Sequence, residues 1–177
     1  MILMREVKIP SGVKVAIEGN ALKVSGKLGS TAKQLNQKLF EVKVTGDTIT
    51  VDSKKHKKLA KKADLAAQAF TSEVQSATES VMNGIEHKMQ AVSAHFPMTF
   101  EVKGDTLFVK NIFGERAPRS TKLVGDTKLE VKGQEVKVKG VDKYDVGQTI
   151  ANIRKVCKSK DKDTRVFQDG LYLVREE

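Results

Sequence analysis

The sequence has few of the residues that cross-link, kink or anchor a protein chain. Its 177 residues include one cysteine, three prolines, two tyrosines and no tryptophan. A single cysteine, Cys157, excludes an internal disulfide framework and favours a reducing compartment. No apolar run approaches the roughly 20 residues that a membrane-spanning helix needs, and the apolar run at residues 1–5 is too short for a signal peptide. We therefore expect a cytoplasmic protein with no membrane partner.

Motifs of catalytic and metal-binding sites are also missing. The three histidines, His56, His87 and His95, form no HxH, HExxH or Cys/His spacing. The sequence contains no GxxxxGK[ST] loop, no GxGxxG between a strand and a helix, and no GxSxG elbow. Cys157 lies in an apolar helical stripe, which favours a buried thiol over a nucleophile. We expect no enzymatic activity, no metal or cofactor, and no small-molecule substrate.

The chain does contain an internal repeat. Residues 15–29 match residues 100–114, and residues 42–51 match residues 129–138. In all four segments apolar residues alternate with polar ones, which is the period of a half-buried strand. A Gly-Asn, Gly-Asp or Gly-Gln pair interrupts each segment, and glycine in the first position suits a two-residue type II′ turn. Each segment is therefore expected to form a β-hairpin.

Those turns predict which residues face each other across the hairpins, because a slip by one residue would invert the apolar face. The expected cross-strand pairs are Val15 with Val24, Ile17 with Leu22, Val44 with Ile49, Val102 with Leu107, and Val131 with Val136.

Each pair of hairpins is followed by a helical pattern with apolar spacings of three and four. In the first copy the stripe is Leu59, Ala63, Ala66, Phe70, Val74, Ala77 and Val81, ending at Asn83-Gly84. In the second copy it is Val146, Ile150, Ile153 and Cys157, with Asp142 as N-cap. Residues 87–95 and 164–174 are expected to add strands. The predicted fold is α+β, with two tandem homologous domains at residues 1–83 and 84–177. Each domain is an antiparallel sheet of hairpins packed against one main helix.

The formal net charge of +10 favours a polyanionic partner, although a charge that serves solubility is the simpler alternative. Residues 1–83 carry 14 basic and 8 acidic side chains, and residues 84–177 carry 18 and 14. Part of the first excess is the lysine cluster at residues 54–62, which is either a solvated helix start or a phosphate-binding segment.

Arginine has the opposite distribution, since five of six arginines lie in the second copy. Arginine suits bidentate phosphate contacts and stacking on bases. Arg116 and Arg119 lie in segment 111–122, which is expected to be a loop between the hairpins. Arg154, Lys155 and the lysines that follow lie at the end of the second helix. The loop and the helix end could form one RNA-facing surface, whereas scattered surface charge is the alternative.

Four segments carry a resemblance to a known family. They are IPSGVKVAIEGNALKVSGKLG, HKMQAVSAHFPMTFEV, NIFGERAPR and IRKVCKSKDKDTRVFQDGLYLV. Over essentially its whole length the chain resembles large-subunit ribosomal protein six, which eukaryotes number nine, in the archaeal and eukaryotic branch. The resemblance implies two similar α+β domains and a structural, non-catalytic role in the large ribosomal subunit.

The resemblance also implies where the chain binds. The C-terminal half would be the main rRNA-binding domain, on large-subunit (23S-type) rRNA near the sarcin–ricin region and the factor-binding centre. Neighbouring ribosomal proteins are expected partners, with translation factors nearby. The Phe-Gly-Glu-Arg loop, which includes Glu115, and the final basic segment are the leading contact candidates. The expected rRNA contacts are Gly114, Arg116, Arg119, Lys122, Arg154, Lys155, Lys158, Lys160 and Arg165.

Two other functions remain open at the level of the sequence. A general nucleic-acid-binding module would be found free of ribosomes in a co-sedimentation experiment. An enzyme whose site the motifs miss would show convergent polar groups in a deep pocket.

Overall fold

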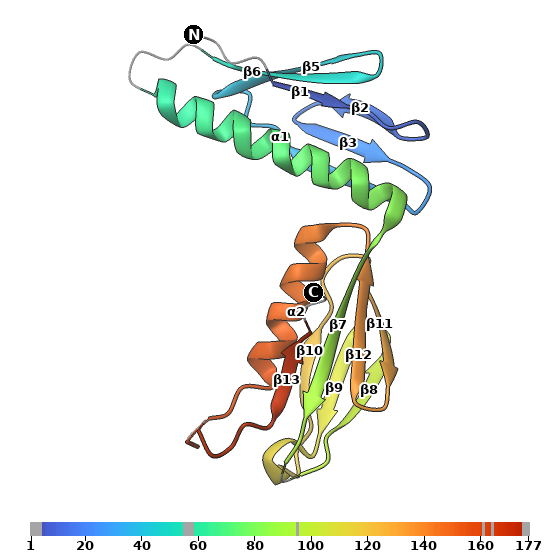
Figure 1. Cartoon of the computed structure of the whole chain (residues 1–177), viewed down its shortest axis with the longest axis vertical. Coiled ribbons are helices and arrows are strands. Elements are labelled where there is room, and N and C mark those ends of the chain that lie inside the picture. The colour runs from blue at the N-terminus through green and yellow to red at the C-terminus, as the bar shows by residue number, and fades with distance from the viewer. Residues whose placement is uncertain (1–4, 55–58, 95, 161, 164, 175–177) are drawn as a thin grey trace. The chain divides into compact units, whose positions relative to one another are not determined.

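A computed structural model describes residues 5–54, 59–94, 96–160, 162–163 and 165–174 (Figure 1). The chain divides into two compact units, residues 1–84 and 85–177. Within the described residues each unit combines two small antiparallel sheets with one long α-helix. The expected α+β fold with a repeated arrangement of hairpins and helix is confirmed.

The first unit packs one helix against two three-stranded sheets, with strand orders β1-β6-β5 and β2-β3-β4. Helix α1 contacts strands of both sheets, and the rings of Phe40 and Phe70 lie 4.8 Å apart in this core. The elements are β1 (Arg5–Lys8), β2 (Lys14–Glu18), β3 (Ala21–Ser25), β4 (Ser30–Gln34), β5 (Phe40–Thr45), β6 (Thr48–Ser53) and α1 (Ala60–Asn83).

The buried face of α1 differs from the predicted stripe at two positions. Ala67 is fully buried whereas Ala66 is half-buried, and Leu59 precedes the helix and is exposed. Both alanines satisfy a spacing of three or four from Ala63, so packing against the sheets decides between them. The predicted end of the helix is confirmed, since α1 stops at Asn83 and Gly84 has a φ of 73°.

The second unit has a four-stranded sheet, β11-β12-β7-β13, and a three-stranded sheet, β10-β9-β8. Helix α2 contacts β10, β12 and β13, and therefore touches both sheets. The elements are β7 (Ile85–Val92), β8 (Thr99–Lys103), β9 (Thr106–Lys110), the 3-10 turn η1 (Ile112–Gly114), β10 (Arg119–Lys122), β11 (Lys128–Lys132), β12 (Glu135–Gly140), α2 (Lys143–Val156) and β13 (Gly170–Leu173).

The hairpins have the predicted turns and register. The first turn residues, Gly19, Gly46, Gly104 and Gly133, have φ between 56° and 59°. The second turn residues are not among those with positive φ, as a type II′ turn requires. All five predicted cross-strand pairs are observed.

The sequence predicted that the two hairpins of a unit form one sheet, but the structure places them in two separate sheets. The first hairpin of each copy gains β4 or β10, and the second gains β1 or β7. Segment 119–122, expected to be part of a loop, is strand β10 and pairs with β9. Its residues Arg-Ser-Thr-Lys show no apolar alternation, so the pairing arises from backbone hydrogen bonds that leave no pattern in the sequence.

Helix α2 is anchored at both ends. At its start the Asp142 carboxylate accepts a hydrogen bond from the Tyr144 amide at 2.8 Å, which confirms the predicted N-cap. Toward its end Ile153 and Cys157 are buried in the core. Burial raises the pKa of Cys157 to about 11, although the nearby Arg119 charge opposes the shift. The thiol is therefore protonated at neutral pH, as expected of a structural cysteine. In the described part of the chain, no helix is long and apolar enough to cross a bilayer.

Candidate nucleic-acid interface

Arg119 is the first residue of β10, and the strand register turns its side chain inward. Arg119 pairs with the buried Val109 and shares a face of the sheet with it. Its side chain is only 16% exposed. An arginine that the sequence placed on a surface loop therefore lies against the interior of the unit.

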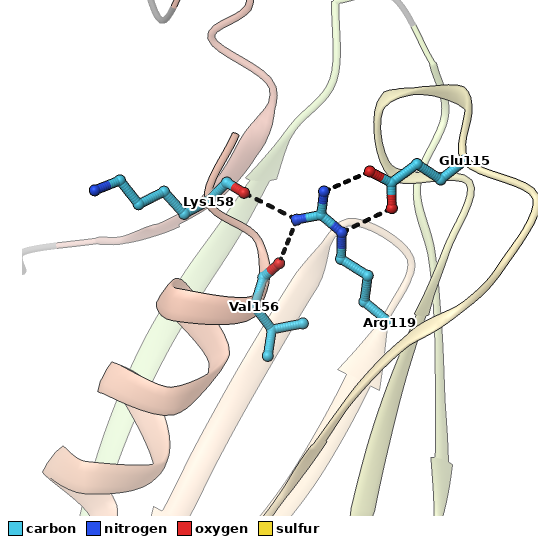
Figure 2. Close-up of polar contacts among 4 residues, drawn as sticks. All are labelled: Glu115, Arg119, Val156 and Lys158. Carbon is cyan, nitrogen blue, oxygen red and sulfur yellow. Dashed lines mark hydrogen bonds and ion pairs between the residues drawn. The ribbon is translucent and has the colours of Figure 1, made fainter. Parts of the chain in front are cut away.

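The guanidinium of Arg119 joins the loop before β10 to the end of α2 (Figure 2). Its Nε donates to Glu115 Oε2 at 2.8 Å, and its Nη2 donates to Glu115 Oε1 at 2.5 Å. Its Nη1 donates to the carbonyl oxygens of Val156 and Lys158 at 2.7 and 2.8 Å. These bonds connect segments 37 and 39 residues apart in the chain.

This arrangement uses four of the five N–H donors that a guanidinium possesses. The two carbonyls lie at the C-terminal end of α2, where unpaired carbonyls form the negative pole of the helix. Arg119 satisfies them and neutralises that pole, while Glu115 holds the other side of the guanidinium. The geometry makes Arg119 a clamp between the loop and the helix end.

The loop that contains Glu115 has an unusual backbone. Asn111, Phe113 and Gly114 have φ of 58°, 52° and 75°, in the left-handed region that non-glycine residues rarely adopt. Phe113 is buried, and the Arg119 guanidinium lies 5.6 Å from its ring centroid. A Cβ on Gly114 would meet the Phe96 ring at 3.2 Å. Packing therefore holds the loop in one conformation.

Five of the predicted cations lie in the two segments that this clamp connects, or close to them. Arg116 is exposed in the loop, and Arg154 and Lys155 are exposed in the last turn of α2. Lys158 supplies a clamped carbonyl, and its side chain is exposed. The charge of Lys160 contributes to lowering the pKa of Glu115, so Lys160 also lies near the loop.

Two predicted residues lie differently. Lys122 is three residues after Arg119 on β10, so it faces the opposite side of the sheet. Arg165 donates to the Asp163 carboxylate at 3.1 and 3.0 Å, although its side chain is 88% exposed. Lys122 therefore does not lie on the same side of the sheet as Arg119, and the charge of Arg165 is partly offset by Asp163.

Part of the lysine cluster at residues 54–62 is described. Lys54 Nζ donates to the Gln37 carbonyl at 2.7 Å, and Lys61 and Lys62 are exposed at the start of α1. Some residues that the sequence analysis singled out lie outside the described residues. They are Lys55, His56, Lys57, Lys58, His95, Thr164 and Arg175.

The sequence reasoning missed two participants. The charge of Lys162 also acts on the Glu115 carboxyl, and its ammonium lies 4.8 Å from the Phe167 ring centroid. Its place in the same basic segment as Lys160 could have pointed to it. The carbonyl of Val156 could not have been found, because a backbone acceptor leaves no signal in the sequence.

The Glu115 carboxylate should make the stability of this clamp depend on pH. The hydrogen bond from Arg119, helped by nearby positive charges, lowers the pKa of Glu115 below its usual value of 4.5. Because the pKa of Glu115 is lower in the folded than in the unfolded chain, the ionised carboxylate stabilises the fold at pH values above 4.5. This contribution is lost as the pH falls through the folded-state pKa. The stability difference between the protein and Glu115→Gln should be present at neutral pH and vanish in acid, below pH 4.5. Urea unfolding of both proteins across this range would measure it; a difference that does not change with pH would contradict the role of the carboxylate.

Comparison with known proteins gives the chain its family. The model of the family "Ribosomal protein L6" matches residues 96–170. Large ribosomal subunit protein uL6 of Picrophilus torridus is 36% identical over 172 residues, covering 97% of this chain and 94% of the relative. The uL6 proteins of Methanobrevibacter smithii and Haloarcula marismortui are also 36% identical, and cover 99% and 97% of this chain and 97% and 94% of their own lengths. The chain belongs to the ribosomal protein L6 family.

Membership of the L6 family confirms the resemblance drawn from the four segments, including its archaeal type. It gives the chain a structural role in the ribosome, in the large subunit, and not an enzymatic one. The match to the L6 family model lies within the second unit and spans the loop, β10, α2 and the basic segment that follows.

Proposed function

We propose that this L6-family chain binds large-subunit rRNA chiefly through its second domain, residues 84–177. The binding site on the RNA is the region of the sarcin–ricin loop and the factor-binding centre, which the resemblance implies. The chain stabilises the local RNA fold there beside neighbouring ribosomal proteins, and translation factors dock nearby. The basic net charge and the bias of arginine to this half support the proposal.

One observation carries the proposal: Arg119 connects residues 111–118, the arginine loop, to the end of α2. Two basic segments that the sequence singled out separately are thereby held side by side. A pre-formed cluster loses less conformational entropy on binding than two independent segments would.

The proposed contacts divide into two kinds. Arg116, Lys158 and Lys160 bind phosphates, since their side chains are exposed around the clamp. The exposed backbone of Gly114 contacts the RNA beside them. Arg154 and Lys155 extend the surface along α2. Arg119 holds the surface in shape. Lys122 and Arg165 lie apart from the cluster or in an ion pair, and are secondary contacts.

The salt dependence of RNA binding tests this assignment. Removing a phosphate contact reduces the slope of log affinity against log salt by about 0.7–0.9 for each cation. Arg116→Ala should reduce the slope by about one such step, and Lys158→Ala with Lys160→Ala by about two. Filter binding to a large-subunit rRNA fragment at several salt concentrations measures the slopes.

The matched control removes two exposed lysines from the first unit, by Lys8→Ala with Lys43→Ala. It lowers the net charge as much as the lysine pair of the second unit does, yet should leave the slope nearly unchanged. Equal slopes for the two double variants would mean that net charge alone drives binding, and would overturn the proposed surface.

A further inference from the structure

A pocket of about 510 Å³ lies beside the end of α2, between the helix and strand β13. Its cationic lining residues are Arg154, Lys155 and Lys158, all of which the sequence selected for their charge alone. Its other lining residues include Ala151 on the helix and Leu171 on the strand. A volume of this size falls within the range of small-ligand sites in proteins.

The electrostatics of this pocket favour an anion. The three cations are exposed, whereas the one lining carboxylate, Asp169, is 4% exposed and accepts a hydrogen bond from the Ala94 amide at 2.9 Å. The C-terminal end of a helix would normally repel a phosphate. Here Arg119 binds the carbonyls of Val156 and Lys158, so that repulsion is reduced.

Polar groups that are not exposed lie close to the wall of this pocket. The Ser159 hydroxyl is buried and has no hydrogen-bond partner among the described residues. Strand β13 is the edge of its sheet, and the Val174 amide donates to the Lys88 carbonyl of β7. Since hydrogen bonding alternates along an antiparallel strand, the N–H and C=O of Leu171 point away from β7. One donor and one acceptor of Leu171 thus point away from the rest of the sheet, although the residue is only 3% exposed.

Apolar side chains complete the lining. Ala151, Leu171 and the partly buried Phe167 border the pocket, and apolar or aromatic surface is what an unstacked base contacts in RNA-binding proteins. We propose that this pocket receives one unstacked nucleotide of the bound RNA, with its base inside and its phosphate against the cations. The inference rests on the proposed function and names the chemical group bound at one part of that surface.

An acidic peptide lying along β13 as a fifth strand is the other occupant that an edge strand suggests. Strand β13 has four residues, so two of them can offer outward backbone bonds to such a peptide. Backbone bonds from two residues are few for the addition of a whole strand, whereas a single nucleotide needs no more than these. The pocket beside the strand therefore favours the nucleotide.

Filling the pocket without changing its charge is the first test. Ala151 is exposed and lines the pocket, so Ala151→Phe should occlude it and weaken binding of the full chain to an rRNA fragment about tenfold. Gln148→Phe is the matched control, since Gln148 is exposed on the same helix but does not line the pocket. It should bind as tightly as the unchanged protein. Equal affinity of all three proteins would overturn the pocket assignment.

Small probes identify the occupant. Adenosine 5′-monophosphate added to the ¹⁵N-labelled full chain should shift the amide resonances of Ala151, Lys158 and Leu171, and Ala151→Phe should abolish these shifts. Adenosine and inorganic phosphate alone should cause smaller shifts. Equal shifts with inorganic phosphate would reduce the pocket to a simple anion site. Shifts with a hexaglutamate peptide but not with the nucleotide would favour strand addition, and no shifts with any probe would leave the pocket without a ligand; each of these results overturns the proposal.

The design separates this inference from the proposed function. If the unchanged protein does not bind the rRNA fragment, the proposed function fails. If it binds but Ala151→Phe binds equally well, the surface stands and only the nucleotide pocket is wrong.

Discussion

Arg119→Ala is expected to destabilise the protein by about 2–3 kcal/mol, the most of any single change at the proposed interface. The substitution leaves the carbonyls of Val156 and Lys158 without their donor and the Glu115 carboxylate without its partner. Hydrogen bonds to charged groups contribute about 1.5–3 kcal/mol each, and partial solvent exposure of Glu115 reduces the sum. Guanidinium chloride unfolding followed by circular dichroism measures the change.

Two variants show whether geometry or charge is responsible. Arg119→Lys keeps the charge, but an ammonium cannot reproduce the planar set of four donors, so it should recover less than half of the loss. Arg116→Ala removes an equal charge at an exposed position in the loop before β10, and should leave stability within about 0.5 kcal/mol. Full recovery by lysine would show that Arg119 acts through charge alone, and a stable Arg119→Ala would remove the clamp altogether.

Gly140→Ala is expected to destabilise the protein by about 3 kcal/mol, at the upper end of the cost of overpacking. A Cβ at Gly140 would lie 2.6 Å from Val146 Cγ2 and 3.1 Å from Thr127 Cγ2. Val146 is fully buried, and a β-branched side chain on a helix has little freedom to move aside. The close approach of the end of β12 to the start of α2 therefore requires glycine.

The same substitution seven residues later should have the opposite sign. Gly147 is exposed on α2, and a Cβ there meets nothing within 4 Å. Gly147→Ala should stabilise the protein by about 0.5–1 kcal/mol, because alanine has the higher helix propensity. Thermal unfolding of both variants measures the pair. Similar shifts for the two would mean that the contact with Val146 does not restrict position 140.

The sequence predicted the local structure of this chain well where the signal was short in range. The alternation around Gly19 and Gly133 predicted both the hairpins and their register, because a two-residue turn allows one pairing that keeps the apolar face continuous. The N-cap at Asp142 could also be predicted, because the amide that its carboxylate binds lies only two residues away. Strand β10 was missed, because its polar residues pair through the backbone with a strand whose identity the sequence does not state.

The candidate site shows the limit of the same reasoning. Charge and spacing selected Arg119 as a contact for RNA, yet the structure turns it inward to clamp Glu115 and the carbonyl of Val156. The residue type was informative, since a planar guanidinium suits both uses. Which use is realised depends on partners up to 39 residues away.

The sequence by itself determined the duplication, the hairpins, the family resemblance and the concentration of arginine in the second copy. These properties depend on residue identity and on neighbours within a few positions. The tertiary structure alone decided that the arginine loop meets the end of α2, that Ala67 and not Ala66 faces the sheets, and that Arg154, Lys155 and Lys158 border a pocket. Such outcomes depend on which distant segments pack together, and packing is a property of the whole unit that no single segment encodes.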